Sequence, residues 1–171
     1  MRRSPVPVPQ KKSWLSTRNP MIEELKIGKF SLSQINAFLK HPHLARLATA
    51  VPVRDDPNFF QPHNVPVWYW WDGTALWISA FQSTRKVKEV KRNPYIAVLV
   101  DVAQAVDGIT AVLMEGKSEW IVESSVVQEM SRIIYTHYMG EEGVKAAAPQ
   151  SWIVDPENSI IQLIPKKMYA W

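Results

Sequence analysis

Positively charged side chains gather where a short helix is predicted to begin. Ser83 and Thr84 are typical residues of a helix N-terminus. The turn that follows holds Arg85, Lys86 and Lys88 and no acid. Cations are unfavourable there, because the first turn already carries a partial positive charge and four unpaired backbone N–H groups. A bound phosphate would make this arrangement favourable, because it would accept hydrogen bonds from the N–H groups, the hydroxyls and two cations. Charge placement alone leaves it equally open that the cations simply extend into solvent.

The first strand of the hairpin predicted before this helix is apolar on both faces. In Asn64–Trp71, alternate residues point to opposite sides of the strand, and neither side is polar. One face holds Val65, Val67, Tyr69 and Trp71, and the other holds Pro66, Trp68 and Trp70. Asp72-Gly73 predicts a hairpin turn into a partner strand over 75–81. Such a strand needs a barrel interior on one side and a subunit interface or a flat ligand on the other.

Other polar groups give weaker indications of chemistry. His41, His43, His63 and His137 lack an accompanying acid cluster, so we expect surface or capping histidines and no metal. Arg46, in a predicted strand, either faces a ligand or closes a buried ion pair. The absence of cysteine excludes thiol nucleophiles, disulfides and cysteine-ligated zinc. No motif of hydrolases, kinases or metalloproteases is present.

The apolar periodicity predicts a small antiparallel β-barrel with about three peripheral helices. Helices are expected over 31–40, 84–92 and 123–138, the last ending at Gly140. Strands are expected over 44–53, 64–71, 75–81, 95–102, 108–122 and 159–164, with a possible break at Gly116. Residues 52–62 are expected to form a loop, and Pro66 favours an irregular or edge position for its strand.

Length and charge predict one folded domain behind a basic arm. The 171 residues fit a single domain, and the net charge is +4. Residues 1–18 carry five cations and no acid, which leaves −1 for the rest of the chain. We therefore expect an extended, Pro-rich basic arm over 1–20 and a domain over 21–171. The chain has neither a long apolar run nor a secretory signal, so no membrane association and a cytoplasmic location are expected.

The order of these motifs resembles the pyridoxamine 5′-phosphate oxidase-like flavin-binding split barrels. The segments that carry the resemblance are 63–73, 76–79, 83–86 and 91–94, within a match over 31–122 and a weaker one from Ser159 to the end. The resemblance implies a six-stranded antiparallel Greek-key split barrel. It also implies a homodimer that binds FMN at the subunit interface and acts as an oxidoreductase on a small molecule.

The resemblance further implies which residues contact the flavin. Arg85 and Lys86, with the Ser83 and Thr84 hydroxyls, would hold the phosphate. The other implied contacts are Ile78, Ser79 and Ala80 for the ring and ribityl chain, backbone groups of Val65, Pro66, Val67 and Trp68 for the polar ring edge, and Arg46 and Trp171. Trp171 would reach the partner's flavin. Catalytic residues are not identified.

The C-terminus departs from the pattern of the true oxidase. That enzyme uses an Arg-x-His segment to bind the vitamin phosphate, whereas residues 166–171 contain no histidine. Synthesis of pyridoxal phosphate is therefore not expected, and the substrate is unknown. A deazaflavin-dependent reductase on the same barrel is an alternative, as is a flavin carrier without catalysis. A single-stranded nucleic-acid-binding barrel is less favoured, because the body of the chain lacks the basic charge expected beside stacking tryptophans.

Overall fold

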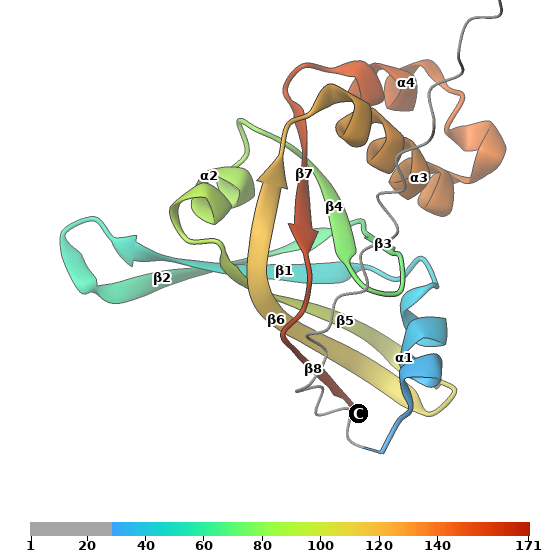
Figure 1. Ribbon diagram of the computed structural model, residues 1–171, viewed down its shortest axis with the longest axis horizontal. Helices are drawn as coiled ribbons and strands as arrows, with labels where there is room; N and C mark the ends of the chain where they lie inside the picture. The colour runs from blue at the N-terminus through green and yellow to red at the C-terminus, as the bar shows by residue number, and fades with distance from the viewer. Residues whose placement is uncertain (1–28) are drawn as a thin grey trace, which may run out of the picture.

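The computed structural model describes residues 29–171 as a twisted antiparallel sheet with helices around it (Figure 1). The predicted arm over 1–20 lies outside the described residues. The strands pair in the order β2-β1-β5-β6-β7-β4-β3, and β8 pairs with β6. β2 and β3, at the two ends of this order, do not pair with each other within the described residues. The expected class, a mainly β split barrel, is confirmed.

The described residues form four helices and eight strands. The helices are α1 (Leu32–Leu39), α2 (Arg85–Arg92), α3 (Ser124–Gly143) and α4 (Ala147–Val154). The strands are β1 (Ala45–Val53), β2 (Asp56–Val67), β3 (Trp70–Trp71), β4 (Leu76–Phe81), β5 (Tyr95–Val106), β6 (Ile109–Ile121), β7 (Asn158–Leu163) and β8 (Lys167–Ala170). None of these helices is both long and apolar enough to cross a membrane.

The expected counts of six strands and three helices are too low. The chain leaves the ladder at Trp68 and Tyr69, which makes β3 a separate short strand. β8 forms because Met168 and its neighbours pair with β6, a long-range contact with no signal in the local sequence. α4 carries Pro149 in its first turn, where a helix tolerates proline, but has no apolar stripe that would have predicted it.

The predicted loop over 52–62 is wrong, because this segment extends β1 and β2 into a long hairpin. Pro52 pairs with Phe60, and Ala50 with Pro62. The hairpin projects from the body of the sheet at the left of Figure 1. β2 is an edge strand, and an edge strand accepts prolines because its outer N–H groups have no partner to lose. The same position agrees with the edge placement that Pro66 predicts.

β6 runs unbroken through Gly116 and joins two parts of the sheet. It pairs with β5 and β8 on one stretch and with β7 on the next. A Cβ at Gly116 would lie 2.9 Å from the carbonyl oxygen of Ile164. Gly116 is therefore required by a close backbone approach and does not end the strand.

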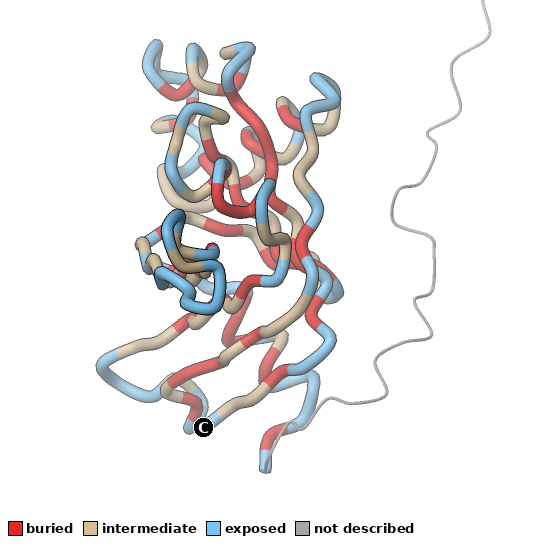
Figure 2. Tube along the Cα trace, turned by 90° about the vertical axis from the view of Figure 1, so that its left-hand side faces the viewer, coloured by how far each residue is buried: buried red, intermediate tan, exposed pale blue. Residues whose placement is uncertain are grey.

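Two apolar clusters fill the fold, one between the strands and one beneath α3 and α4. Buried and exposed stretches alternate along much of the chain, as the burial colours of Figure 2 show. The segment Asn64–Trp71 was expected to be covered on both faces, and other parts of the same chain provide some of this cover. Tyr69 and Trp71 are buried in the first cluster, whereas Trp68 and Trp70 pack into the second. The ring of Tyr138 on α3 stacks on Trp68, with centroids 4.8 Å apart and planes 6° from parallel. A helix thus covers part of the face for which a ligand or a subunit was expected.

His43, which follows α1, and His137 on α3 predict an acid-sensitive fold. Burial, together with the nearby histidines, lowers the pKa of His43 and of His137 from the ordinary 6.5. The unfolded chain therefore takes up protons first, and the free energy of unfolding should fall as the pH drops below about 6.5. Denaturant titrations between pH 8 and 5 should show this fall, and the double variant His43→Asn/His137→Asn should flatten it. An equal pH slope in the variant would contradict the assignment.

Candidate functional site

A cavity of about 380 Å³ opens between the start of α2 and the end of β2, which Trp68 follows. Its lining comes from the residue before β1, the end of β2 and the residue after it, β4, α2 and α3. The lining residues are Leu44, Pro66, Val67, Trp68, Ser79, Lys86, Ile134 and Tyr135. The fold therefore brings together Lys86, Ser79 and the Pro66–Trp68 stretch, as the sequence predicts.

Lys86 supplies the charge in this largely apolar lining. Its side chain is half-buried, and burial lowers the pKa of its amine from the ordinary 10.5. α2 starts with Thr84 in the N-cap position and has no acidic residue in its first turn. The partial positive charge of the helix start and the desolvated amine therefore act at the same place. Both would be stabilised by an anion in the cavity.

The hydroxyl of Ser79 lines the cavity, but its hydrogen bonds are already made. It donates to Oδ1 of Asn158 at 3.0 Å and accepts from the Ser131 hydroxyl at 3.2 Å. The Tyr135 hydroxyl lies 2.8 Å away, and it is the donor in this pair because Ser79 has used its single proton. Ser79 therefore fixes the wall of the cavity and orients Tyr135. A ligand would have to replace one of these bonds to use the hydroxyl.

The predicted phosphate-binding hydroxyls are placed differently from each other. Thr84 donates its hydroxyl proton to the carbonyl of Phe81 at 2.6 Å, so that proton is not free for an anion. Ser83 is exposed at the turn before α2. Arg85 is exposed, does not line the cavity, and donates through Nε to Glu89 at 2.7 Å.

Two of the expected ring contacts point into the protein core. Along β4 the buried and half-buried residues alternate, and both Ile78 and Ala80 belong to the buried set. Val65 packs against the same core. None of Ile78, Ala80 and Val65 is among the residues that line the cavity. Within residues 29–171, β2 pairs on one side alone, with β1, and its other backbone edge has no strand partner from Val65 to Val67.

Arg46 and Trp171 lie away from the cavity lining. Arg46 pairs with Asp101 through Nε at 2.7 Å, in an exposed ion pair between β1 and β5. Of the two alternatives for Arg46, the structure therefore shows an ion pair, although this pair with Asp101 of β5 is not buried. The backbone of Trp171 bonds to Thr110 and Ala111, and its indole ring is half-exposed.

Several residues at or near the site escaped sequence analysis. Tyr135 and Leu44 line the cavity, yet neither stands out by type or spacing. Glu89 is buried and joins β1, β2 and α2. The four-residue spacing from Arg85 to Glu89 is that of a helical ion pair and could have indicated one of its contacts. Among residues 29–171 no set of three or more histidine or acidic side chains is arranged to hold a metal.

Comparisons with known proteins identify the fold and the family. No curated protein matches the sequence. A conserved hypothetical protein from Mycobacterium tuberculosis has a TM-score of 0.67 at 19% identity, over 87% of this chain and 89% of that chain. An F420 reductase has a TM-score of 0.59 at 20% identity, over 78% and 94% of the two chains. The flavocytochrome Anf3 from Azotobacter vinelandii has a TM-score of 0.57 at 16% identity, over 82% and 66%.

The TM-scores of these structures establish a shared fold. The family follows from the sequence itself. The sequence model of the family described as pyridoxamine 5′-phosphate oxidase matches residues 32–171, most of the chain. The match begins at α1 and ends at the last residue after β8, so it includes every described helix and strand. The resemblance inferred from the motifs is therefore confirmed: the chain belongs to the pyridoxamine 5′-phosphate oxidase family.

Proposed function

We propose that this protein is an FMN-binding oxidoreductase that acts on a small molecule at the cavity beside α2. The observation that carries the proposal is Lys86, a desolvated amine at a helix start, placed in an apolar cavity next to Trp68. An amine in this setting is stabilised by a ligand anion, and the apolar wall suits a flat ring attached to that anion.

The residues of the cavity fit a flavin phosphate and ring. Lys86 and the free N–H groups of α2 supply donors for the phosphate. Trp68 and Val67 supply apolar surface, and the open edge of β2 supplies backbone groups for the polar side of the ring. The volume of about 380 Å³ falls within the usual range for small-molecule sites.

When bound, the flavin supplies the transfer of electrons or hydride, and the protein binds and orients it. Lys86 would hold the phosphate end, and the Ser79 hydroxyl keeps the Tyr135 hydroxyl in a fixed direction at the cavity wall. α3 closes one side of the cavity through Ile134 and Tyr135 and so limits access of water. Formation of pyridoxal phosphate is not part of the proposal, because residues 166–171 lack the Arg-x-His segment.

A deazaflavin is the second candidate cofactor. The similarity to an F420 reductase favours it as the alternative. Both cofactors combine a flat ring with a phosphate, so the same lysine serves either.

A titration of the purified protein tests the proposal. FMN, riboflavin, a deazaflavin cofactor and a fluorescent oligonucleotide should be added separately, with ligand fluorescence as the readout. We expect FMN to bind more tightly than riboflavin, because riboflavin lacks the phosphate. Preference for the deazaflavin would replace the cofactor and retain the site. Binding of the oligonucleotide alone, with strong salt dependence, would contradict the proposal.

We also propose that the protein works as a homodimer with the cofactor at the interface. Supporting this, Leu44 lines the cavity yet is half-exposed in the single chain, as is the indole ring of Trp171. Light scattering on a size-exclusion column should give a mass near twice 19.6 kDa. A monomer that binds FMN at full affinity would contradict the dimer and leave the cofactor proposal in place.

A further inference from the structure

A buried carboxylate lies on the same helix as the cavity's lysine. Glu89 is 4% exposed, and its neighbours Val87 and Val90 belong to the main core. Taking an ionised carboxylate out of water is costly unless the charge is paired and hydrogen-bonded. The surroundings of Glu89 must therefore compensate its charge.

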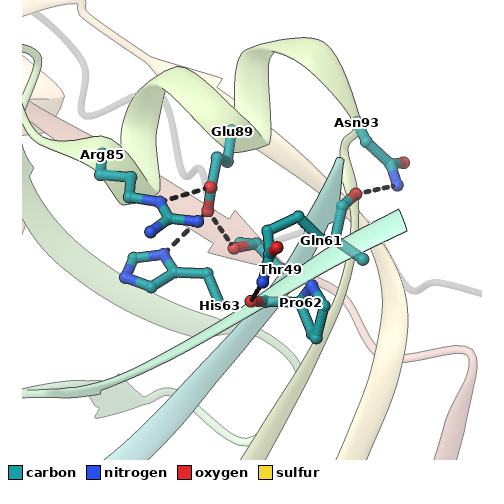
Figure 3. A network of polar contacts seen from close by, with 8 residues as sticks. Thr49, Gln61, Pro62, His63, Arg85, Glu89 and Asn93 are labelled. Atoms are coloured by element: carbon teal, nitrogen blue, oxygen red, sulfur yellow. Dashed lines mark hydrogen bonds and ion pairs between the residues drawn. The ribbon is translucent and has the colours of Figure 1, made fainter. Parts of the chain in front are cut away.

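Side chains from three elements converge on this carboxylate (Figure 3). Thr49 of β1 donates to Oε2 at 2.5 Å, and the ring Nδ1 of His63 on β2 lies 2.8 Å from the same oxygen. Arg85 of α2 donates through Nε to Oε1 at 2.7 Å. Burial alone would raise the pKa of Glu89, but these hydrogen bonds outweigh it and hold the pKa below the ordinary 4.5. The carboxylate is thus an ionised acceptor in a fixed position.

The anchoring of Arg85 leaves the outer part of its guanidinium free. Within residues 29–171, its terminal amino groups make no hydrogen bond or ion pair, and the side chain is 57% exposed. Guanidinium groups bind phosphate through such donors, often by two parallel bonds. Arg85 directly precedes Lys86, which lines the cavity, and His63 lies on the same strand as Pro66 of the cavity wall. The network and the cavity therefore share α2 and β2.

We propose that Glu89 is a positioning residue for the anionic group of the ligand. It holds Arg85 at Nε, which leaves the terminal amino groups for a second contact with the anion that Lys86 binds. Glu89 itself does not touch the ligand. The inference rests on the proposed function, in which a phosphate lies at the start of α2. An arginine already held in place loses less conformational freedom on binding, so its contact with the anion contributes more to affinity.

The sign of the effect separates positioning from simple electrostatics. If only charge mattered, removal of the negative Glu89 would strengthen anion binding in every variant. Positioning predicts otherwise for Glu89→Leu, which cannot accept a bond from Arg85, and this variant should bind FMN about tenfold more weakly. Glu89→Gln loses the charge but keeps an acceptor oxygen, so it should bind FMN at least as tightly as the wild type.

Riboflavin and a double variant complete the test. FMN and riboflavin should be titrated into the wild type, Glu89→Leu, Glu89→Gln, Arg85→Ala and Arg85→Ala/Glu89→Leu. The riboflavin affinity should stay constant, because it has no phosphate, whereas a damaged fold would weaken both ligands. The double variant should bind FMN no more weakly than Arg85→Ala, because Glu89 acts through Arg85. Should Glu89→Leu not fold, Arg85→Lys tests the same point: it keeps the charge, loses the Nε anchor and should also bind FMN about tenfold more weakly.

The outcomes distinguish this inference from the proposed function. If the wild type binds FMN and the two single effects multiply in the double variant, the positioning role is overturned and the cofactor site stands. Unchanged or tighter FMN binding by Glu89→Leu, or full FMN affinity in Arg85→Lys, also overturns it. A wild type that binds neither FMN nor a deazaflavin overturns the proposed function, and the inference with it.

Discussion

Lys86→Ala should lower the affinity for FMN about ten- to a hundredfold. The variant removes a charge-assisted contact with the phosphate, which contributes roughly 1.5–3 kcal/mol. The loss is expected at the upper part of this range because the amine is half-buried and lines an apolar cavity. Affinity would be measured by titration of FMN fluorescence, with riboflavin as the ligand that should not respond.

Lys88→Ala is the matched control for this prediction. Lys88 carries the same charge on the same helix, but it is exposed and does not line the cavity. Its replacement should therefore change the FMN affinity less than threefold, as expected for a screened surface charge. Because the pKa of Lys86 is lowered, FMN binding to the wild type should also weaken as the pH approaches 10.5 from below, and Lys86→Ala should lack this dependence. Equal effects of the two lysine variants would place the phosphate elsewhere.

Ile78→Ala should destabilise the fold by about 2–5 kcal/mol, the usual cost of a truncated, fully buried aliphatic side chain. Ile78 is 0% exposed in the main core and pairs with Ile161 of β7. A loss of this size is a large fraction of the roughly 5–15 kcal/mol that stabilises a typical domain. Urea unfolding followed by tryptophan fluorescence would measure it.

Ile164→Ala is the control, because Ile164 is 39% exposed and follows the end of β7. It should cost less than about 1 kcal/mol. The milder Ile78→Val retains the fold and separates a core role from a cofactor contact, since a core residue should alter stability and leave the FMN affinity unchanged. A weakened FMN affinity in Ile78→Val, with stability intact, would instead restore the contact that the resemblance implies.

Local patterns were sufficient for most elements and for the family. The helix that begins after Ser31 and the Asp72-Gly73 turn occur where the sequence predicts them, because each depends on residues a few positions apart. The cation-rich start of α2 was predicted for the same reason. These motifs were also enough to identify the family, because their order and spacing along the chain are themselves local information.

The structural features that sequence analysis missed depend on pairing between segments that are distant in the sequence. β8 exists because it meets β6, and residues 52–62 are extended because they continue the β1–β2 ladder. Isolated strand propensity is weak for both segments, since β structure depends on the neighbouring strand. The same long-range order places Tyr135 at the cavity and Thr49 beside Glu89, which are 40 residues apart in sequence.

The sequence by itself determined that cations occupy the start of a helix that follows a tryptophan-rich hairpin. An anion attached to a flat ring is the ligand expected from this order. Only the tertiary structure decided which of those cations lies in the cavity and which is paired with a carboxylate. Lys86 is desolvated in the cavity, whereas Arg85 is anchored to Glu89. The charge of a side chain and its position in a helix depend on residues that are close together in the sequence. Its burial and its hydrogen-bond partners depend on which distant strands pack against the helix.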